Sequence, residues 1–378
     1  MASDTPTINR AVWLSSFTEP PSIINLPVPD ATAGTAVISV LATPIVPYTN
    51  LVHSGKIPQL NLILPLVPNP NAIGRVHTVG PDAIRVKPGA LVYVDATIHG
   101  RDNANVTIMA GHHGGEGPEG RKLMQGEWRD GSLQQFQKVP LENIYPLDEQ
   151  RLTRDLGYTP AVLQSIAHYS VAGGAILEAA DVKIAETVVV GPCAGSFRGL
   201  AVELALTLGA NVIGIGPFED ELKRMKEVLN HPRFNYVAMT GDDDIDTAAI
   251  LRATPNGLGA DVISDWSPGF LESPPFLLAA ARTLKTHGRV VLSGGTPGNI
   301  RVPYALMVQR GLDIRGKWMC SRQTLERVIN MIEQGQLKIG AESGTKLDVF
   351  SLDEHRQATE HAAKHGGWRK YTAVIPNA

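Results

Sequence analysis

Cysteine is nearly absent from this chain, since Cys193 and Cys320 are the only two in 378 residues. Two cysteines exclude a disulfide framework and a four-cysteine zinc lobe. A charge excess of one sign is also lacking, because 34 Lys and Arg residues are balanced by 37 Asp and Glu residues and the formal net charge is −3. This balance gives no reason to expect nucleic acid or an anionic membrane surface as a partner.

Long apolar runs are missing as well. No stretch approaches the ~20 apolar residues that a membrane-spanning helix needs. The segment from Met1 to Pro6 lacks the basic region and apolar core of a signal peptide. We therefore expect a soluble, cytoplasmic protein that acts on a small-molecule substrate. Hydrophobic residues make up 43% of the chain, which is enough for real cores, and the length predicts two domains at ~150 residues each.

The strongest motif begins at Val188. An apolar β-branched run, Val188 to Val190, leads into a glycine-rich turn and then into an apolar segment from Leu200 to Leu208. This order predicts a strand, a tight loop and a buried helix. A further strand expected at Asn211–Ile215 completes a strand–helix–strand unit of about 30 residues. The N–H groups and dipole at the start of such a helix favour an anion such as a pyrophosphate.

The glycines of this loop leave two interpretations open. Their spacing, Gly191-x3-Gly195-x3-Gly199, departs from G-x-G-x-x-G, so an ordinary strand-to-helix turn is the alternative to a dinucleotide site. The repeated strand–helix units around the loop favour the dinucleotide site. The residues expected to contact the cofactor lie in the loop and in or after the following strands: Gly191, Gly195, Ser196, Phe197, Arg198, Gly199, Gly216, Arg224, Ser264 and Gly294.

The end of the second strand bears on which cofactor binds. NAD binders usually carry Asp or Glu there to hold the ribose 2′-OH. Here Gly216 occupies that end and leaves room for a 2′-phosphate. Arg224 is a candidate partner for this phosphate, and a solvated helix face is the alternative for that residue. The missing carboxylate favours NADPH over NADH.

The residue pattern changes along the chain. Residues 1–155 are β-rich, with strands expected at 35–42, 75–79, 90–94 and 134–139 between Pro and Gly turns. A polar, glycine-rich segment, Gly111–Gly131, interrupts them and is predicted to be a surface lobe. Strand-like and helical runs then alternate over residues 156–324, which predicts a parallel sheet covered by helices. Residues 325–378 return to a mixed pattern, with helices expected at 324–332 and 352–364 and a strand at 371–375.

A family resemblance rests on several short segments and on their order and spacing: Gly74–Gly80, Val86–Val92, Asp130–Phe136, Glu186–Gly191, Leu208–Ile213, Gly288–Gly294 and Val349–Leu352. With these segments the chain resembles the medium-chain dehydrogenase/reductase superfamily in its zinc-free, quinone-reductase-like branch. The resemblance implies an α/β protein with a GroES-like β-rich catalytic domain, residues 1–155 and 325–378. A Rossmann domain with a doubly wound parallel sheet, residues 156–324, would be inserted in it. It also implies a homodimer formed through an edge strand near Asp313 to Gly316.

The same resemblance bears on zinc. The zinc alcohol dehydrogenases of this superfamily carry Gly-His-Glu shortly before the glycine matched by Gly74, whereas this chain has Asn69, Pro70 and Asn71. Their first ligand cysteine falls near Val46. With both ligand types missing, no catalytic zinc is expected. Other potential ligands lie in the glycine-rich lobe without regular spacing, and a solvated lobe is favoured there over a metal site: His112, His113, Glu116 and Glu119.

Without zinc, the substrate oxygen must be polarised by hydrogen bonds from the protein or by a ribose hydroxyl of the cofactor. Tyr48 falls where relatives place a hydroxyl-bearing proton-relay residue, and a phenol can donate to a developing oxyanion. An amphipathic tyrosine at a domain edge is the alternative, and Asn50 and His53 are weaker candidates. We therefore expect a zinc-independent, NADPH-dependent oxidoreductase acting on an activated C=C, a quinone or a carbonyl. A dinucleotide-binding protein without redox turnover (a sensor, a scaffold or a non-redox catalyst) is the alternative.

Overall fold

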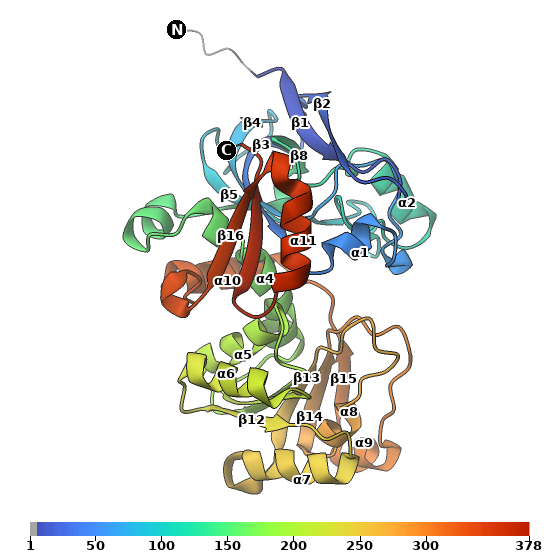
Figure 1. The fold of residues 1–378 in the computed structure, drawn as a ribbon, viewed down its shortest axis with the longest axis vertical. Helices are drawn as coiled ribbons and strands as arrows, with labels where there is room; N and C mark the ends of the chain where they lie inside the picture. The colour runs from blue at the N-terminus through green and yellow to red at the C-terminus, as the bar shows by residue number, and fades with distance from the viewer. Residues whose placement is uncertain (1–5, 378) are drawn as a thin grey trace. The chain divides into compact units, whose positions relative to one another are not determined.

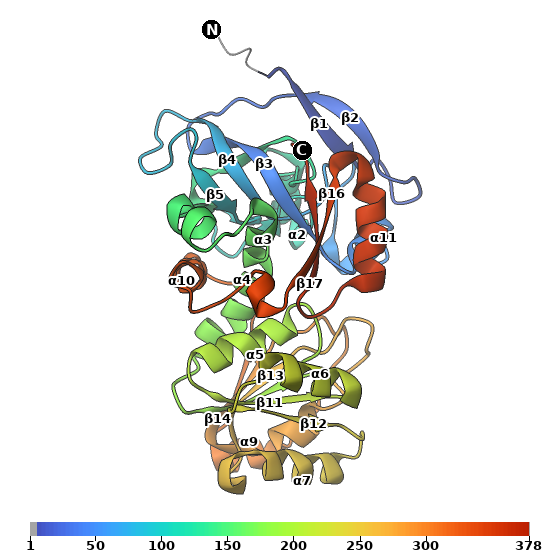
Figure 2. The same cartoon turned by 60° about the vertical axis from the view of Figure 1, so that its left-hand side comes forward.

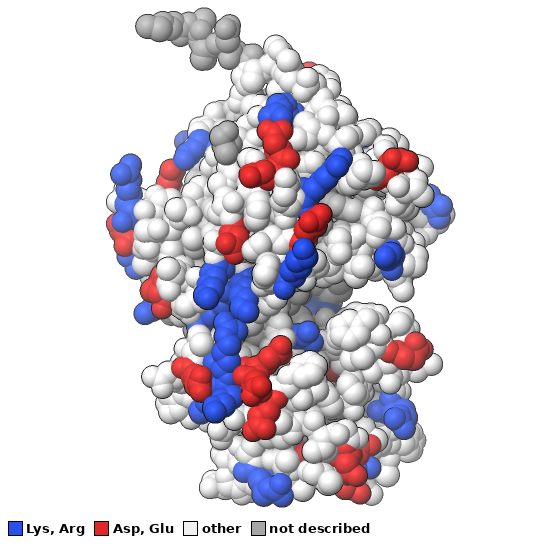
Figure 3. Space-filling model, viewed as in Figure 1, with Lys and Arg blue, Asp and Glu red and all other residues white. Residues whose placement is uncertain are grey.

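The computed structural model describes residues 6–377, and the chain divides into two compact units (Figure 1). Unit 1 comprises Met1–Ala167, Ile339–Gly366 and Lys370–Ala378, and unit 2 comprises His168–Lys338 and Gly367–Arg369. Each unit is built on one large sheet. Within residues 6–377, no helix has the length and apolar character needed to cross a membrane. On the face shown in Figure 3, acidic and basic side chains are interspersed, as the small net charge predicts.

The sheet of unit 1 has seven strands in the order β16-β17-β3-β4-β5-β9, with β8 also paired to β3. Its pairs are antiparallel except for the parallel pair β16–β17. The inward-facing side chains of β3, β4 and β5, such as Ile38, Val76 and Val92, form one core. The strands are β3 (Thr35–Ile45), β4 (Ala72–Val79), β5 (Leu91–Val94), β8 (Phe136–Pro140), β9 (Ile144–Pro146), β16 (Lys346–Ser351) and β17 (Lys370–Ile375).

Two small hairpins and several helices complete unit 1. The hairpins are β1 (Ile8–Trp13) with β2 (Ser22–Pro27) and β6 (Thr97–His99) with β7 (Thr107–Met109). Helix α11 packs on β16 and β17 (Figure 1) and buries Ala358 and Ala362 on its inner side. The helices are α1 (Thr49–His53), α2 (Gly117–Gln125), α3 (Pro160–Leu163) and α11 (His355–His365), with short turns η1 (Pro58–Leu60), η2 (Leu141–Asn143), η3 (Gln150–Asp155), η6 (Ala341–Ser343) and η7 (Leu352–Glu354).

The sheet of unit 2 is parallel throughout, in the order β12-β11-β10-β13-β14-β15. The chain runs outward from β10 to one edge and then continues from β13 to the other, so the switch in direction lies beside β10. The expected doubly wound parallel sheet is confirmed. The strands are β10 (Thr187–Gly191), β11 (Asn211–Gly216), β12 (Phe234–Ala238), β13 (Ala260–Asp265), β14 (Leu284–Leu292) and β15 (Asp313–Gly316).

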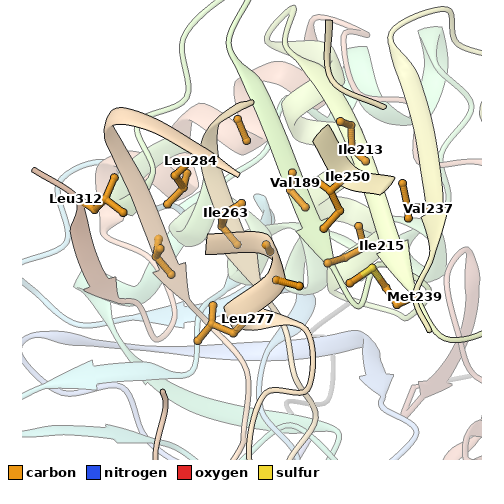
Figure 4. Packing of buried hydrophobic residues seen from close by; sticks show 14 residues of the cluster. Val189, Ile213, Ile215, Val237, Met239, Ile250, Ile263, Leu277, Leu284 and Leu312 are labelled. Atoms are coloured by element: carbon orange, nitrogen blue, oxygen red, sulfur yellow. The ribbon is translucent and has the colours of Figure 1, made fainter. Parts of the chain in front are cut away.

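Helices cover both faces of this sheet. Alternate strand residues such as Val189, Ile213 and Ile263 pack against side chains of α7, α8 and α9 (Figure 4). Helices α5 and α6 pack on β10, β11 and β12 from the other side (Figure 2). The helices are α4 (Ile166–Gly173), α5 (Arg198–Thr207), α6 (Glu219–Leu229), α7 (Asp243–Ala253), α8 (Leu277–Ala281), α9 (Tyr304–Arg310) and α10 (Arg322–Glu333), with η4 (Gly174–Ala179) and η5 (Pro255–Gly257).

Helix α10 shows how sequence determines such an element. Ser321 caps its first turn by accepting a hydrogen bond from the Thr324 N–H group. Leu325, Val328 and Ile332 recur at helical spacing and are buried. The predicted helix at 324–332 is therefore confirmed.

One local prediction was wrong and another was incomplete. The sequence from Pro275 to Leu284 predicts a helix over that whole range. Helix α8 ends at Ala281 instead, because the Thr283 carbonyl accepts a hydrogen bond from the Ala260 N–H group and draws the chain into the sheet. The segment Gly111–Gly131, predicted to be a surface lobe or loop, also has a buried side. It contains helix α2, which buries Met124 completely in a core with Leu14 and Ile108.

Candidate cofactor and substrate sites

The glycine loop lies at the topological switch of unit 2. Strand β10 ends at Gly191 between β11 and β13, and helix α5 begins at Arg198 immediately after the loop. Ligands of doubly wound sheets bind at this edge, outside the carboxyl ends of the strands. The N–H groups of Gly199, Leu200 and Ala201 in the first turn of α5 donate to carbonyl oxygens of the loop, so it is the positive end of the helix dipole that favours an anion here.

Arg198 provides a positive charge at the same place. Its side chain folds back over Gly195, where an added Cβ would lie 2.1 Å from Arg198 Nε. The guanidinium is partly buried and has no hydrogen-bond or ion-pair partner among residues 6–377. Burial lowers the pKa of Arg198, and nearby Cys193, Glu221 and Asp265 oppose that effect. A partly desolvated, unpaired cation beside a helix N-terminus is suited to a phosphate group.

The end of β11 is open, as the sequence predicts. A Cβ placed at Gly216 would meet only Leu222 Cδ2, at 3.6 Å. Arg224 lies on the exposed side of α6 and has no ion-pair partner in the part of the chain that the structure describes. Its side chain is therefore free to reach a ligand or to remain solvated.

The other predicted cofactor residues have contacts within the protein. The Ser196 hydroxyl donates to the Gly367 carbonyl oxygen over 3.3 Å, and the Phe197 ring stacks on His168 with 5.2 Å between ring centroids. The Ser264 hydroxyl accepts a hydrogen bond from Trp266 Nε1 over 2.8 Å. A Cβ at Gly294 would lie 2.3 Å from the Ser267 carbonyl oxygen, so the backbone passes very close there. The structure brings Gly191, Gly195–Gly199, Gly216, Ser264 and Gly294 to one edge of the sheet, whereas Arg224 is on α6.

A buried carboxylate on α5, which the sequence interpretation missed, ties a remote segment to this helix. Glu203 accepts hydrogen bonds from Tyr169 Oη at 2.9 Å, Trp368 Nε1 at 2.6 Å, and Arg369 Nε and Nη2 at 3.0 Å each. The Trp368 indole lies against Gly199, where an added Cβ would fall 2.1 Å from Cδ1. The signal was present in the sequence, because Glu203 is the one charged residue between Leu200 and Leu208.

In unit 1, the positions that would hold a catalytic zinc do not fit a metal. Asn69 donates through Nδ2 to Thr43 Oγ1 at 2.5 Å and to the Pro44 carbonyl oxygen at 2.8 Å. Asn71 accepts through Oδ1 from the Ala96 N–H group at 2.9 Å. Val46 has no ligating atom. The two amides that replace the expected ligands are engaged with the protein backbone and a hydroxyl.

Tyr48 has the environment of a neutral hydrogen-bond donor. It is partly buried directly before α1, and burial raises the pKa of its phenol to about 12. Its Oη atom has no hydrogen-bond partner within the described residues. Asn50 is exposed on α1. Burial, reinforced by nearby His355, lowers the pKa of His53 to about 4, so this imidazole is neutral at pH 7.

His112 lies beside Tyr48, and its predicted solvation was wrong. Its exposed fraction is 8%, and its ring centroid is 6.1 Å from that of Tyr48 at an interplanar angle of 55°. Burial is the main cause that lowers the pKa of His112 to about 4, with smaller contributions from His113 and His53. The error arose because polar, glycine-rich sequence was equated with exposure, although the apolar Ile108 to Ala110 leads directly into it.

The remaining lobe residues form no metal site in the structure. His113 accepts a hydrogen bond through Nδ1 from the Gly115 N–H group at 2.9 Å, while Glu116 and Glu119 are exposed. Within residues 6–377, no group of three or more His, Cys, Asp or Glu side chains has an arrangement that could hold a metal ion.

Gln164 is a second buried polar residue that the sequence interpretation missed. It lies at the C-terminal end of α3 and is 1% exposed, and neither amide atom has a hydrogen-bond partner among the described residues. A polar residue inside the apolar run from Ala161 to Ile166 was the available signal.

Comparisons with known proteins agree with this architecture. Residues 199–334 match the family described as zinc-binding dehydrogenase. No curated protein sequence matches the chain. Among solved structures, AibC matches with a TM-score of 0.78 at 18% identity, covering 98% of this chain and 97% of AibC.

Two further structures were solved with NADP. The crotonyl-CoA carboxylase/reductase AntE in complex with NADP matches with a TM-score of 0.75 at 16% identity, covering 99% of this chain and 96% of AntE. A zinc-binding dehydrogenase from Sinorhizobium meliloti 1021 bound to NADP, itself assigned only provisionally, matches with a TM-score of 0.72 at 19% identity. That match covers 98% of this chain and 100% of the other.

Proposed function

We propose that this chain is a zinc-independent, NADPH-dependent reductase of small carbonyl-containing substrates, within the medium-chain dehydrogenase/reductase superfamily. The family match of residues 199–334 and the fold shared with solved structures over the whole chain support this proposal. The observation that carries the proposal is Arg198, a partly buried cation without a partner beside the glycine loop at the switch point of the sheet.

The residues of unit 2 fit NADPH. Arg198, at the positive end of the α5 dipole, would hold the pyrophosphate, and the space beside Gly216 would admit the ribose with its 2′-phosphate. Arg224 is the proposed partner of that phosphate. NADP bound to two proteins of the same fold, at 16% and 19% identity, supports this choice.

Zinc independence is supported by the donor set in unit 1. The side-chain amides of Asn69 and Asn71 are engaged in hydrogen bonds, and Val46 offers no donor. Substrate polarisation is then left to hydrogen-bond donors, of which Tyr48 is the proposed one.

A bound nicotinamide would supply a hydride, a hydrogen nucleus with two electrons, to the electrophilic carbon of the substrate. As the new C–H bond forms, the π-electron pair of the substrate shifts towards its oxygen. The Tyr48 phenol donates a hydrogen bond to that oxygen and gives it a proton, which solvent restores to Tyr48. The hydride and the proton from Tyr48 would together add two electrons and two hydrogens to the substrate.

The test is a titration of the whole protein with NADPH and with NADH, followed by thermal unfolding and then by absorbance decay with enones, quinones and ketones. Cofactor binding to the folded state must raise Tm. We expect tighter binding of NADPH than of NADH, weaker binding of both by Arg198→Ala, and wild-type binding by Arg252→Ala, an exposed arginine of α7 that serves as control. Tyr48→Phe should bind NADPH normally and lose most of its turnover. Binding without turnover on any acceptor would favour a non-redox dinucleotide-binding protein instead.

We propose in addition that two copies pair through β15. This strand is one edge of the parallel sheet, with β12 at the other, and Ile314 on it is 36% exposed. Neighbouring helix α9 exposes Tyr304 at 81% and Val308 at 66%. An open edge beside exposed apolar side chains suits an isologous strand pair. Analytical ultracentrifugation should show a dimer for the wild type and a monomer for Ile314→Pro, which removes a donor from the edge. A monomeric wild type at micromolar concentration would refute the pairing.

A further inference from the structure

Tyr48, which is partly buried, and His112, which is buried, form a pair of neighbouring polar side chains. They come from different segments of unit 1, the turn between β3 and α1 and the loop after β7. Neither the Tyr48 hydroxyl nor a ring nitrogen of His112 has a hydrogen-bond partner among residues 6–377. The described residues include fully enclosed polar atoms without a partner, but neither of these two groups is among them. Both can therefore be reached from outside the protein, and a ligand would complete their bonding.

The backbone around His112 holds this imidazole rigidly. A bridge between Met109 and His113 closes the turn, with N–H to oxygen distances of 2.8 and 2.9 Å. Gly111 at its tip has a φ of +68°, and a Cβ there would lie 2.6 Å from Gly131 Cα. The Gly111 carbonyl oxygen also accepts a hydrogen bond from the Asn69 N–H group at 2.9 Å. The position of His112 is therefore fixed before any ligand arrives, as an effective hydrogen-bond donor requires.

Both groups are neutral donors at pH 7. Burial keeps the Tyr48 phenol protonated and holds the pKa of His112 at about 4, and nearby His113 and His53 lower it further. A neutral imidazole carries one N–H donor. No ion pair involves Tyr48 or His112 among the described residues. A site with two neutral donors stabilises a carbonyl oxygen on which charge develops, whereas a carboxylate or phosphate would be buried there without a counter-charge.

We propose that His112 is a second catalytic residue that binds the carbonyl oxygen of the substrate together with Tyr48, and that the substrate is therefore an uncharged enone or quinone rather than an unsaturated acid. This inference rests on the proposed reductase function. His112 binds and orients the oxygen, while Tyr48 gives the proton. No electron or atom leaves His112 during the reaction.

Three variants test the role of His112. His112→Phe keeps an aromatic ring against Tyr48 and removes the donor. His112→Gln restores a donor of similar reach. His99→Gln changes an exposed histidine of the same unit that contacts only Thr107 Oγ1 and serves as the control. With NADPH and cyclohexenone, kcat should fall by about 10²-fold in His112→Phe, recover in part in His112→Gln and stay unchanged in His99→Gln.

A binding measurement separates this inference from the proposed function. The probe is 4-nitrophenol, whose oxygen mimics the developing oxyanion, and its absorbance reports binding in the absence of turnover. The wild type and His99→Gln should bind it, and His112→Phe should bind it at least about 10-fold more weakly. Wild-type turnover of cyclohexenone with unchanged kcat and phenol binding in His112→Phe would overturn the role of His112 and leave the reductase intact. Phenol binding that depends on His112 without turnover of any acceptor would instead overturn the reductase.

A comparison of two substrates tests whether the substrate is uncharged. Cyclohexenone should be reduced and cinnamate should not, because cinnamate brings a carboxylate to two neutral donors. Equal kcat/KM for the two compounds would overturn the assignment to uncharged carbonyl substrates. If His112→Phe does not fold, His112→Gln still decides the question, because the amide preserves polarity and predicts partial activity.

Discussion

Replacing Glu203 by glutamine should weaken unit 2 far more than the loss of one surface charge would. The Glu203 side chain is 8% exposed and that of Arg369 is 11% exposed, and their closest nitrogen–oxygen distance is 3.0 Å. The variant Glu203→Gln keeps the size and one acceptor oxygen of the side chain. It removes the negative charge that offsets the buried guanidinium and turns an NH₂ group towards donors of Trp368 or Arg369.

The expected magnitude follows from burial. Breaking a buried ion pair by changing one partner costs about 3–5 kcal/mol. In a unit of 150–250 residues each kcal/mol lowers Tm by about 2–4 °C, so a fall of about 6–20 °C is expected. The double variant with Arg369→Met should recover part of the loss, because the uncompensated cation is then absent. Glu227→Gln, an exposed residue on α6, makes the same change of charge and should shift Tm by less than about 2 °C.

The assay is thermal unfolding of the full chain followed by circular dichroism, with tryptophan fluorescence in parallel. Release of the Trp368 indole from Glu203 and Gly199 should shift the emission to the red before global unfolding. A Tm for Glu203→Gln equal to that of Glu227→Gln would refute the reasoning. So would a double variant that is less stable than Glu203→Gln by the full cost of a second independent change.

Three more predictions concern stability. Burial raises the pKa of Asp95 to about 6, so the folded state loses stability as pH rises from about 4 to about 6. In urea unfolding, Asp95→Asn, which keeps an acceptor for Thr97, should therefore be more stable than the wild type by up to ~3 kcal/mol at pH 7 and by little at pH 4. An equal gain in stability at both pH values would contradict this cause. Burial lowers the pKa of His168 to about 4, so this residue should lower the stability of the wild type by up to ~3 kcal/mol as pH falls from about 6.5 to 4. His168→Gln should reduce this dependence of stability on pH, and an equal dependence in the two proteins would count against the prediction. Phe234 is fully buried, so Phe234→Ala should cost about 3–5 kcal/mol, whereas Val228→Ala at 40% exposure should cost less than about 1 kcal/mol by the same urea assay.

The sequence predicted the parallel sheet of unit 2 well because its signals are local. The β-branched run at Val188 to Val190 and the glycines after it determine a strand and a tight turn, and both ends of β15 agree with the prediction. Arg198 could be proposed as a cofactor residue for the same reason, since it follows the loop directly in sequence.

The hairpin of β1 and β2 was missed because, at the start of β1, the apolar side chain faces solvent and the polar one faces the interior. Ile8 is 55% exposed while Asn9 is 1% exposed, so the polar residue points inward. Asn9 Nδ2 donates to Gln134 Oε1 at 2.8 Å and to the Phe136 carbonyl oxygen at 2.9 Å. These partners are remote in sequence, and no pattern within β1 indicates them.

The residues of the candidate sites likewise differ in whether the sequence alone indicates them or whether they depend on contacts between distant segments. Tyr48 was identified through the family resemblance, but His112 and Glu203 depend on contacts between distant segments. Gly111 packs on Gly131, and Glu203 meets Trp368 and Arg369. A buried charge needs a counter-charge, so a lone glutamate in an apolar helix predicts that a cation is near without saying which one.

The order in which strands emerge during synthesis has a consequence for how this chain reaches its folded state. Strand β17 pairs with β16 on one side and with β3 on the other, so β3 leaves the ribosome long before its neighbour exists. Until then its edge near Thr43 to Ile45 is an open template for other chains. The short segment just before β17 belongs to unit 2 and carries Trp368 and Arg369, which satisfy Glu203 of the same unit. A ribosome that stalls before this segment therefore releases both units unfinished, and quality-control factors would meet an exposed strand edge and a buried anion at the same time.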